Sequence, residues 1–235
     1  MRLFRDTPTS VLAVYAHPDD ADVAAGGALA RWARDGARVE LVIVCDGAKG
    51  SHDPHVNVDE LRRRRASELA RAGEILGLHS VQCLQVSDGD VTNSLEFRGE
   101  LVGLIRHHRP QLVVGPDPTA VFFGGVYVNH RDHRELGWAL LDAVAPAAAM
   151  PLYFPDRGDA HQVATMLLSG THDPDVVVDI TSTIDDKVAA VAAHASQVSD
   201  DAEWVRSVVH GRAEPVGRDV NVRFGEAFRC VDFAR

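Results

Sequence analysis

Cysteine is scarce in this sequence, and the paired spacing that cysteine-based sites use is missing. The 235 residues include three cysteines, Cys45, Cys83 and Cys230, with no Cys-x-x-Cys pair. An odd number of widely spaced thiols argues against a disulfide framework and against a metal site built from thiolates. Cys45 and Cys83 lie in apolar, strand-like runs, and we expect both to be small core residues.

Long apolar runs and an excess of positive charge are also missing. The first apolar run, residues 11–16, is too short for the core of a signal peptide, and no stretch is long enough to span a bilayer. Asp and Glu number 34 against 24 Lys and Arg, a formal net charge of -10. A chain this acidic is a poor partner for nucleic acid or anionic lipid. We therefore expect a cytoplasmic protein that acts on a small molecule.

Three widespread active-site motifs are absent. No Gly-x-Gly-x-x-Gly follows the first predicted strand, since Gly26 and Gly27 lie inside the next predicted helix, and this disfavours a dehydrogenase. No Gly-Lys-Ser/Thr sequence follows Asp46, so the glycine-containing loop there is not a Walker loop. No Gly-x-Ser-x-Gly elbow occurs, and Cys45 has no neighbouring base in the sequence. Redox, nucleoside-triphosphate and serine-hydrolase chemistry are therefore disfavoured.

The first half of the chain alternates between strand and helix patterns. Apolar residues make up 46% of the sequence, enough for a sizeable core. Strands are predicted over residues 11–16, 39–44, 81–86 and 112–114, and helices over 21–35, 58–76 and 94–108. Such alternation predicts an α/β fold: a Rossmann-like, mostly parallel sheet with helices on both faces. The arginine run 62–65 is expected to be a solvated helix face.

The second half is less regular. We predict a loop over residues 116–128, a helix over 129–144, and strands over 150–154, 163–168 and 176–180. Helices follow over 181–197, capped by Ser182 or Thr183, and over 200–210, while the tail 220–233 has no clear pattern. No repeat or linker interrupts the sequence, so residues 1–235 are expected to form a single domain.

The first cluster of reactive side chains is His17-Pro18-Asp19-Asp20, directly after the first predicted strand. Ligands of parallel α/β sheets bind beyond the carboxyl ends of the strands, where this turn lies. His17 and Asp20 are three residues apart and project to one side of a helical turn, where they suit zinc. Asp19 points elsewhere and is free to contact a metal-bound water. The ordinary structural explanation is a helix N-cap.

The second cluster is the segment 129–134, Asn-His-Arg-Asp-His-Arg. His130 and His133 are also three residues apart, with Asp132 between them, although a charged helix start explains this segment equally well. Together the two clusters supply His, Asp and His ligands with spare acid and base groups, the composition of a catalytic zinc site with an open position. The same donors also accept iron or cobalt.

Several segments resemble one known family. The sequence VLAVYAHPDDADVAAGGALARWARDG, at 11–36, resembles the opening of the LmbE-like family, also called the PIG-L de-N-acetylases. NHRDH at 129–133 is similar to the family's second metal motif, His-x-Asp-His. Residues 177–197, ending in HASQ, resemble its late helix, and GEAFR at 225–229 resembles its closing segment. The matches span most of the chain in the family's order.

The resemblance implies a Rossmann-like fold, one zinc ion per chain and hydrolysis of an N-acyl group, usually the acetyl group of an N-acetylglucosamine conjugate. It implies roles at six positions: zinc ligands His17, Asp20 and His133, general base Asp19, oxyanion donor His130, and Asp132, which orients His130. Some members also use a tyrosine near the second motif, and Tyr127 is close to it here. A homo-oligomer is compatible with the sequence.

Two departures from the family concern the substrate rather than the chemistry. Ala21 stands where a glutamate usually follows the paired aspartates, and Ala48-Lys49 stand where an acidic residue is common. Two alternatives therefore remain. One is an amidase acting on N-acyl thiol conjugates. The other is a non-catalytic Rossmann-like module that binds a sugar, in which Asp19 would be structural. Metal content separates the enzyme from the module, because the module needs no stoichiometric ion.

Overall fold

One eight-stranded sheet forms the centre of the molecule, in the order β1-β9-β10-β8-β5-β2-β3-β4. The computed structural model describes residues 1–198 and 201–233. Five neighbouring strands are parallel: β2 (Ser10–Tyr15), β3 (Arg38–Cys45), β4 (Ser80–Val86), β5 (Leu112–Pro116) and β8 (Thr165–Ser169). β10 (Gly225–Asp232) runs antiparallel between β8 and β9 (Val176–Asp179), and β1 (Arg2–Leu3) pairs in parallel with β9. The predicted fold class is confirmed.

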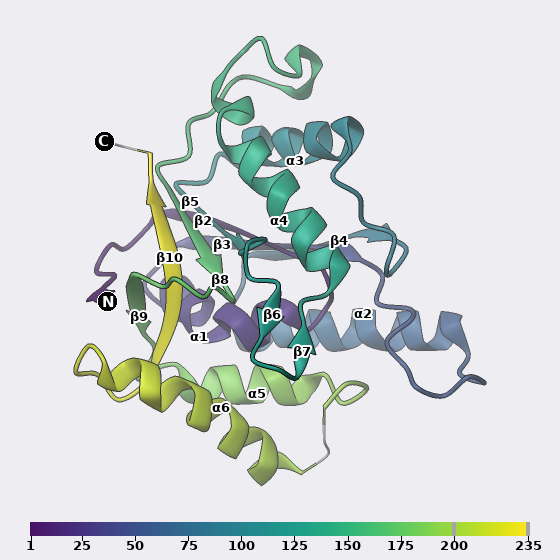
Figure 1. Ribbon diagram of the computed structural model, residues 1–235, viewed down its shortest axis with the longest axis vertical. Coiled ribbons are helices and arrows are strands. Elements are labelled where there is room, and N and C mark those ends of the chain that lie inside the picture. Colours follow the sequence, from purple (N-terminus) through teal and green to yellow (C-terminus); the bar gives the residue numbers. More distant parts are fainter. Residues whose placement is uncertain (199–200, 234–235) are drawn as a thin grey trace.

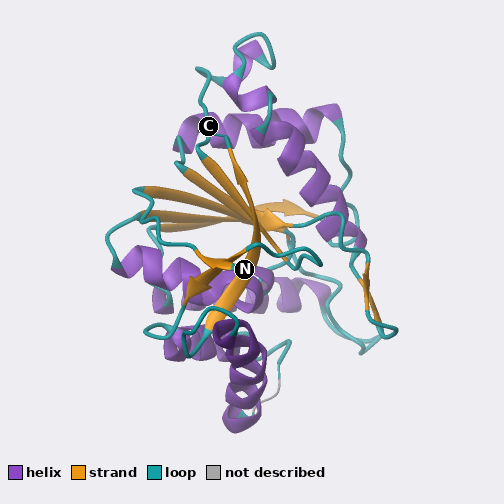
Figure 2. Cartoon of the chain, turned by 60° about the vertical axis from the view of Figure 1, so that its left-hand side comes forward, coloured by secondary structure: helices purple, strands orange, loops and turns teal. Residues whose placement is uncertain are grey.

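Helices cover both faces of this sheet (Figures 1 and 2). One face carries α1 (Asp20–Arg34), α2 (Val58–Ile75), α5 (Ile184–Ala193) and α6 (Ala202–Arg218), and the other carries α3 (Leu95–His108) and α4 (Arg131–Val144). Alternate residues of β2 enter separate cores: Val11 and Ala13 pack on the α1 side, Leu12 and Val14 on the α4 side. Burial on both faces explains why the parallel strands read as continuous apolar runs. No helix in the described ranges is long and apolar enough to cross a membrane.

The predicted strand at 150–154 is wrong. These residues form turns that lead into the short 3-10 helix η2 (Pro155–Arg157), and Leu152 is 89% exposed. The buried guanidinium of Arg106 explains the shape, because it donates hydrogen bonds to backbone carbonyls on both sides of the segment, including those of Ala147, Met150 and Phe154. The chain curls around one cation and cannot extend into a strand.

Other differences concern element boundaries. The predicted 116–128 loop contains a small antiparallel hairpin, β6 (Phe122–Phe123) and β7 (Tyr127–Val128), and the unassigned tail supplies β10. Thr183 occupies the N-cap position of α5 but makes no capping bond, since its hydroxyl donates to the Gly27 carbonyl instead. The last helix begins at Ala202 and continues to Arg218, and the predicted start at Asp200 lies outside the described residues.

Candidate metal centre and its cavity

The reactive side chains gather beyond the carboxyl ends of the parallel strands. His17 follows β2, Asp46 follows β3, and Asp88 follows β4. The start of α4 approaches the same rim and brings the second sequence cluster against the first, although more than a hundred residues separate them. The topology therefore assembles the site in the place that parallel sheets favour for ligands.

His17, Asp20 and His133, the three residues that the sequence predicts as metal ligands, converge on one point. Nδ1 of His17 lies 3.1 Å from Nε2 of His133 and 3.3 Å from Oδ2 of Asp20. Nε2 of His133 lies 3.0 Å from the same carboxylate oxygen. One atom from each side chain can therefore contact a single ion at their centre.

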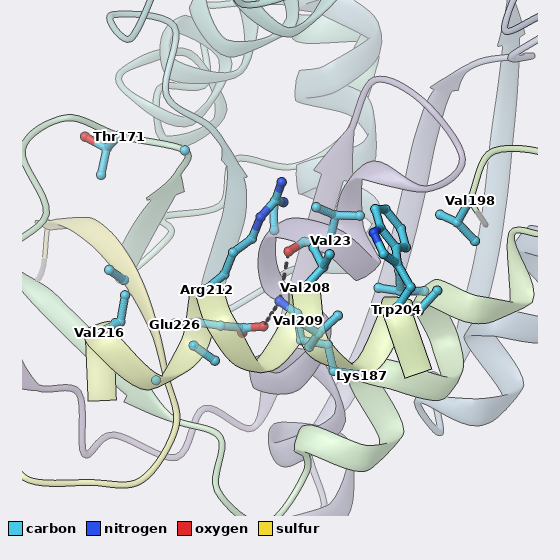
Figure 3. Close-up of a pocket in the computed structure, with 17 residues that line it drawn as sticks. Val23, Thr171, Lys187, Val198, Trp204, Val208, Val209, Arg212, Val216 and Glu226 are labelled. Carbon is cyan, nitrogen blue, oxygen red and sulfur yellow. Dashed lines mark hydrogen bonds and ion pairs between the residues drawn. The ribbon is translucent and has the colours of Figure 1, made fainter. Parts of the chain in front are cut away.

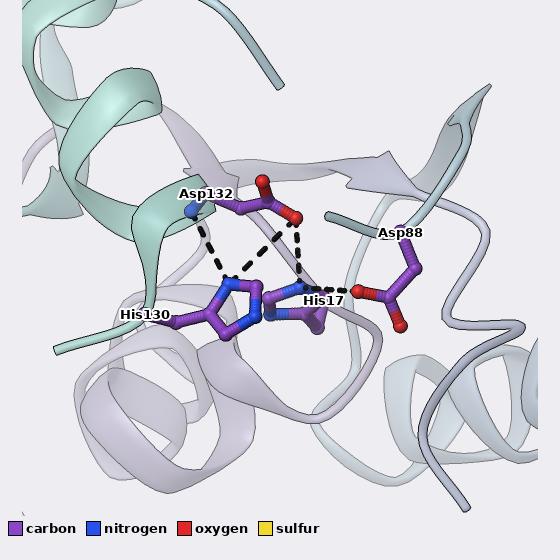
Figure 4. A group of neighbouring side chains, drawn as sticks. All are labelled: His17, Asp88, His130 and Asp132. Atoms are coloured by element: carbon purple, nitrogen blue, oxygen red, sulfur yellow. Dashed lines mark hydrogen bonds and ion pairs between the residues drawn. The ribbon is translucent and has the colours of Figure 1, made fainter. Parts of the chain in front are cut away.

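The outward nitrogens of both imidazoles are held by acceptors. Nδ1 of His133 donates to the Asn129 side-chain oxygen at 2.9 Å. Nε2 of His17 donates to Oδ2 of Asp132 at 3.3 Å and lies 3.2 Å from Oδ1 of Asp88 (Figure 4). These bonds direct the opposite ring nitrogens inward, the arrangement that metal-binding histidines have in proteins. Two inward nitrogens with one carboxylate thus suit a divalent cation such as zinc.

Asp132 is fully buried, and the histidine that its side chain contacts most closely is His17. Its carboxylate accepts from the backbone nitrogens of Gly89 at 2.7 Å and Val91 at 3.3 Å. Burial opposes ionisation, but the hydrogen bonds from His17 and Gly89 outweigh it and lower the pKa of Asp132 to about 2. Oδ2 of Asp132 lies 3.7 Å from Nδ1 of His130, too far for a hydrogen bond. The sequence predicted that Asp132 orients His130, whereas the closer contact is with His17.

The charges of the site favour a protonated imidazole while no cation is bound. Burial alone would lower the pKa of His17, but its hydrogen bonds to three carboxylates outweigh burial and raise that pKa. Burial would likewise raise the pKa of Asp20, yet the neighbouring His133 and His17 lower it. A metal ion would therefore have to displace a proton from His17, which makes metal binding weaker at low pH.

Asp19 does not act as a helix cap. It occupies the N-cap position of α1, but its side chain makes no capping bond. Its Oδ1 instead accepts from Nη2 of Arg65 at 2.8 Å. The ordinary structural explanation for the acidic pair therefore fails at Asp19, whose carboxylate is held at the edge of the site.

Arg65 corrects the prediction that the arginine run is a solvated face. It is only 3% exposed and donates to the Gly47 carbonyl at 2.9 Å as well as to Asp19. Gly47 has φ +66, and a Cβ there would lie 2.6 Å from Nη1 of Arg65. The glycine in this loop thus makes room for Arg65. The four-residue spacing of Leu61, Arg65 and Leu69 was the available signal, because it places Arg65 on the buried stripe of α2.

A cavity of about 410 Å³ opens beside these groups. Asp19, Asp20 and His133 lie in its wall, while Phe123 and Tyr127 reach it from the β6–β7 hairpin. Tyr127, which the sequence marked only as close to the second motif, is therefore a wall residue of the cavity. Two site residues had no predicted role: Asp88, which follows a predicted strand on the same rim, and Asn129, four residues before His133.

A mostly parallel Rossmann-like sheet with a His/Asp cluster at its carboxyl rim defines an α/β protein with a candidate metal centre. The family model PIG-L, described as GlcNAc-PI de-N-acetylase, matches residues 12–144. The chain belongs to this family.

Two relatives and one solved structure illustrate the similarity. The diacetylchitobiose deacetylase of Thermococcus kodakarensis is 33% identical over 94% of this chain and 82% of its own length. A 1D-myo-inositol 2-acetamido-2-deoxy-alpha-D-glucopyranoside deacetylase of Kineococcus radiotolerans is 29% identical over 83% of this chain and 71% of its own. The structure of N,N'-diacetylchitobiose deacetylase from Pyrococcus horikoshii has a TM-score of 0.86, with 28% identity, covering 96% of this chain and 84% of that one.

Proposed function

We propose that this protein is a metal-dependent hydrolase that removes the N-acetyl group from an N-acetylated amino sugar or its conjugate. The observation that carries the proposal is the convergence of two imidazole nitrogens and one carboxylate beside a cavity whose wall includes Asp19, Asp20 and His133. The relatives named above are deacetylases of acetamido sugars, which supports the same substrate class for this chain.

His17, Asp20 and His133 would hold the ion, for which zinc is our proposal and iron or cobalt are alternatives. A divalent ion in this position would polarise the acyl carbonyl and make the attacking water more acidic. Asn129 and Asp132 keep the two imidazoles in the required orientation through their outward nitrogens. The chain thus supplies a preorganised ligand set and leaves the cavity side open to substrate.

Asp19 is proposed as the general base. Its Oδ1 is fixed by Arg65, so the carboxylate keeps one orientation at the cavity wall. From there it would accept a proton from the attacking water and return it to the leaving nitrogen, the two transfers that amide hydrolysis requires. A positioned base of this kind contributes roughly 10²–10⁴-fold to the rate.

His130 is proposed as the donor to the developing oxyanion. Its Nδ1 accepts from the backbone nitrogen of Asp132 at 3.2 Å, which places the ring proton on Nε2. Burial lowers the pKa of His130 below its ordinary value, which favours the neutral imidazole near pH 7. A neutral N–H donates to an oxyanion without first losing a proton, and one such donor contributes roughly 10²–10³-fold to kcat.

Release of free amine from N-acetylated amino sugars tests the proposal. We would compare metal-loaded protein, protein stripped with a chelator, and stripped protein given back zinc, using N-acetylglucosamine glycosides and N-acetylated disaccharides. The proposal expects amine release that falls on stripping and returns with metal. Activity confined to N-acyl cysteine conjugates would favour the thiol-conjugate amidase. Bound metal without turnover of either class would favour a sugar-binding module.

A further inference from the structure

A second cavity, of about 520 Å³, adjoins the cavity at the metal centre. The two share four wall residues: Val23, Ala24, Gly170 and Arg212. Val23 and Ala24 are three and four residues beyond Asp20 in α1, so the helix face that carries the metal-ligand carboxylate continues into the second cavity. A ligand at the metal centre can therefore extend along α1 into this space.

Most of the wall of the second cavity is apolar. Figure 3 shows valine side chains and Trp204 of α6 facing Val23 of α1, with Val198 at the edge. Trp204 is 51% exposed and Val23 is 36% exposed, so apolar surface remains open to solvent beside the metal centre. A concave apolar site next to reactive groups is typical of a ligand-binding pocket.

The polar groups in the wall already have partners. Nζ of Lys187 donates to Oε1 of Glu226 at 2.5 Å and to the Val23 carbonyl at 2.8 Å. The Glu226 carboxylate also accepts from the backbone nitrogens of Gly27 at 3.0 Å and Ala28 at 2.8 Å. Among its described wall residues, no buried side-chain nitrogen or oxygen lacks a partner. A ligand would therefore be selected here by apolar contact.

Arg212 stands where the two cavities meet. Its side chain extends from α6 in Figure 3, and within residues 1–198 and 201–233 it has no hydrogen bond or ion pair. A guanidinium in this position can donate to an oxygen that joins a polar sugar to an apolar substituent. The junction thus connects the cavity that holds Asp19, Asp20 and His133 to one whose wall is rich in valine.

We propose that the second cavity is a subsite for an apolar alkyl or aryl group that the amino sugar carries away from its acetamide. The inference rests on the proposed function, which places the acyl carbonyl beside Asp19 and the metal ligands. A two-carbon acyl group ends there, whereas a substituent elsewhere on the sugar must leave the first cavity. The shared wall of Val23 and Ala24 provides an apolar route.

The ratio of kcat/KM for octyl and methyl N-acetyl-β-D-glucosaminides tests the subsite. We expect the octyl glycoside to be favoured by at least about 10-fold, since each buried methylene contributes about 0.8 kcal/mol, a factor of about four. Trp204→Ala should reduce that ratio by at least about 5-fold, because it removes part of the apolar wall. Trp138→Ala is the matched control: Trp138 is 47% exposed on α4, lines neither cavity, and its variant should retain the wild-type ratio.

The outcomes separate this inference from the proposed function. Hydrolysis of the methyl glycoside without preference for the octyl one overturns the subsite alone. If neither glycoside nor any N-acetylated disaccharide is hydrolysed, the proposed function fails, and calorimetric titration with octyl and methyl 2-amino-2-deoxy-β-D-glucopyranosides decides the subsite. Tighter octyl binding that Trp204→Ala weakens supports it, and equal binding overturns it. A preference for N-octanoylglucosamine instead of the octyl glycoside, or a change in oligomeric mass on Trp204→Ala, also overturns it.

Discussion

At the scale of single residues, two adjacent aspartates occupy different surroundings. Asp20 contacts both metal-site histidines, whereas Asp19 contacts Arg65. The chemical identity of the side chains is the same, so the difference comes from their positions at the start of α1. Asp20 is the first helical residue and lies three residues after His17, while Asp19 precedes the helix and turns toward α2.

Asp19→Asn and Asp20→Asn should therefore differ in metal content and in the reason for which each loses turnover. Asp19→Asn is expected to retain its metal and to lose on the order of 10²–10⁴-fold in kcat, because the amide cannot accept the proton. Asp20→Asn should lose metal, and added metal should partly restore its activity. Metal analysis and amine-release kinetics on both variants check this. Loss of metal in Asp19→Asn with retention in Asp20→Asn would reverse the two assignments.

Asn129 provides a second test at this scale. It is 6% exposed and accepts from Nδ1 of His133, so its removal frees that ring to change tautomer or rotate. Asn129→Ala should weaken metal affinity by about 10–100-fold, the usual effect of losing an outer partner of a histidine ligand. Competition with a chromogenic chelator measures the change. Asn93→Ala is a matched control outside the ligand set, and an equal loss of affinity there would contradict the positional role of Asn129.

The two halves of the proposed metal site could be recognised in the sequence because the spacing within each half is local. His17 and Asp20 share one turn, and His130 and His133 share another, so each half of the site is visible over four residues. The partners that orient these ligands could not be predicted in the same way. Asp88 contacts His17 from a different strand end. Asp132 lies closer to His17 than to its sequence neighbour His130, because α4 packs at the same rim of the sheet.

At the scale of elements, a side chain of the last strand, β10, is hydrogen-bonded to the backbone of the first helix, α1. Glu226 of β10 accepts from two backbone nitrogens inside α1 and pairs with Lys187 of α5. Glu226 is only 5% exposed, so these protein groups, rather than water, supply almost all of its hydrogen-bond partners. The closing segment that resembles the family, residues 225–229, therefore contributes to the structure around α1.

Glu226→Ala should destabilise the fold strongly. It leaves the buried Lys187 ammonium without its carboxylate, and removal of one partner of a buried ion pair costs about 3–5 kcal/mol. Chemical denaturation followed by circular dichroism measures the free energy of unfolding. Glu96→Ala, at an exposed position of α3, is the control and should remain within about 0.5 kcal/mol of wild type. Equal stability of the two variants would contradict the role assigned to Glu226.

Elements with a buried apolar pattern could be predicted from the sequence, and exposed or long-range ones could not. The strands β2, β3 and β4 are continuous apolar or alternating runs. The β6–β7 hairpin was not predicted because Phe122 is 66% exposed and Val128 is 58% exposed, so the segment has no pattern of buried residues. β10 was not predicted because its antiparallel pairing with β8 and β9 depends on the rest of the sheet rather than on its own residues.

At the scale of the whole molecule, the sheet topology explains why residues 17 and 133 meet. Parallel strands joined by crossover helices place all their carboxyl ends on one rim, and α4 starts there after β5. The predicted Rossmann-like fold class therefore also predicts that the site lies at this rim. The antiparallel β10 changes one edge of the sheet without moving that rim.

Metal stoichiometry tests the central claim most directly. Protein purified without chelator should contain one divalent ion per chain by mass spectrometry of the elements, whereas His17→Ala and His133→Ala should each lose most of it, because each removes one of three protein ligands. His79→Ala is the control, since His79 is exposed and lies before β4, at the opposite rim, and it should keep the wild-type stoichiometry. Equal metal content in the wild type and in both ligand variants would contradict a metal centre formed by His17, Asp20 and His133.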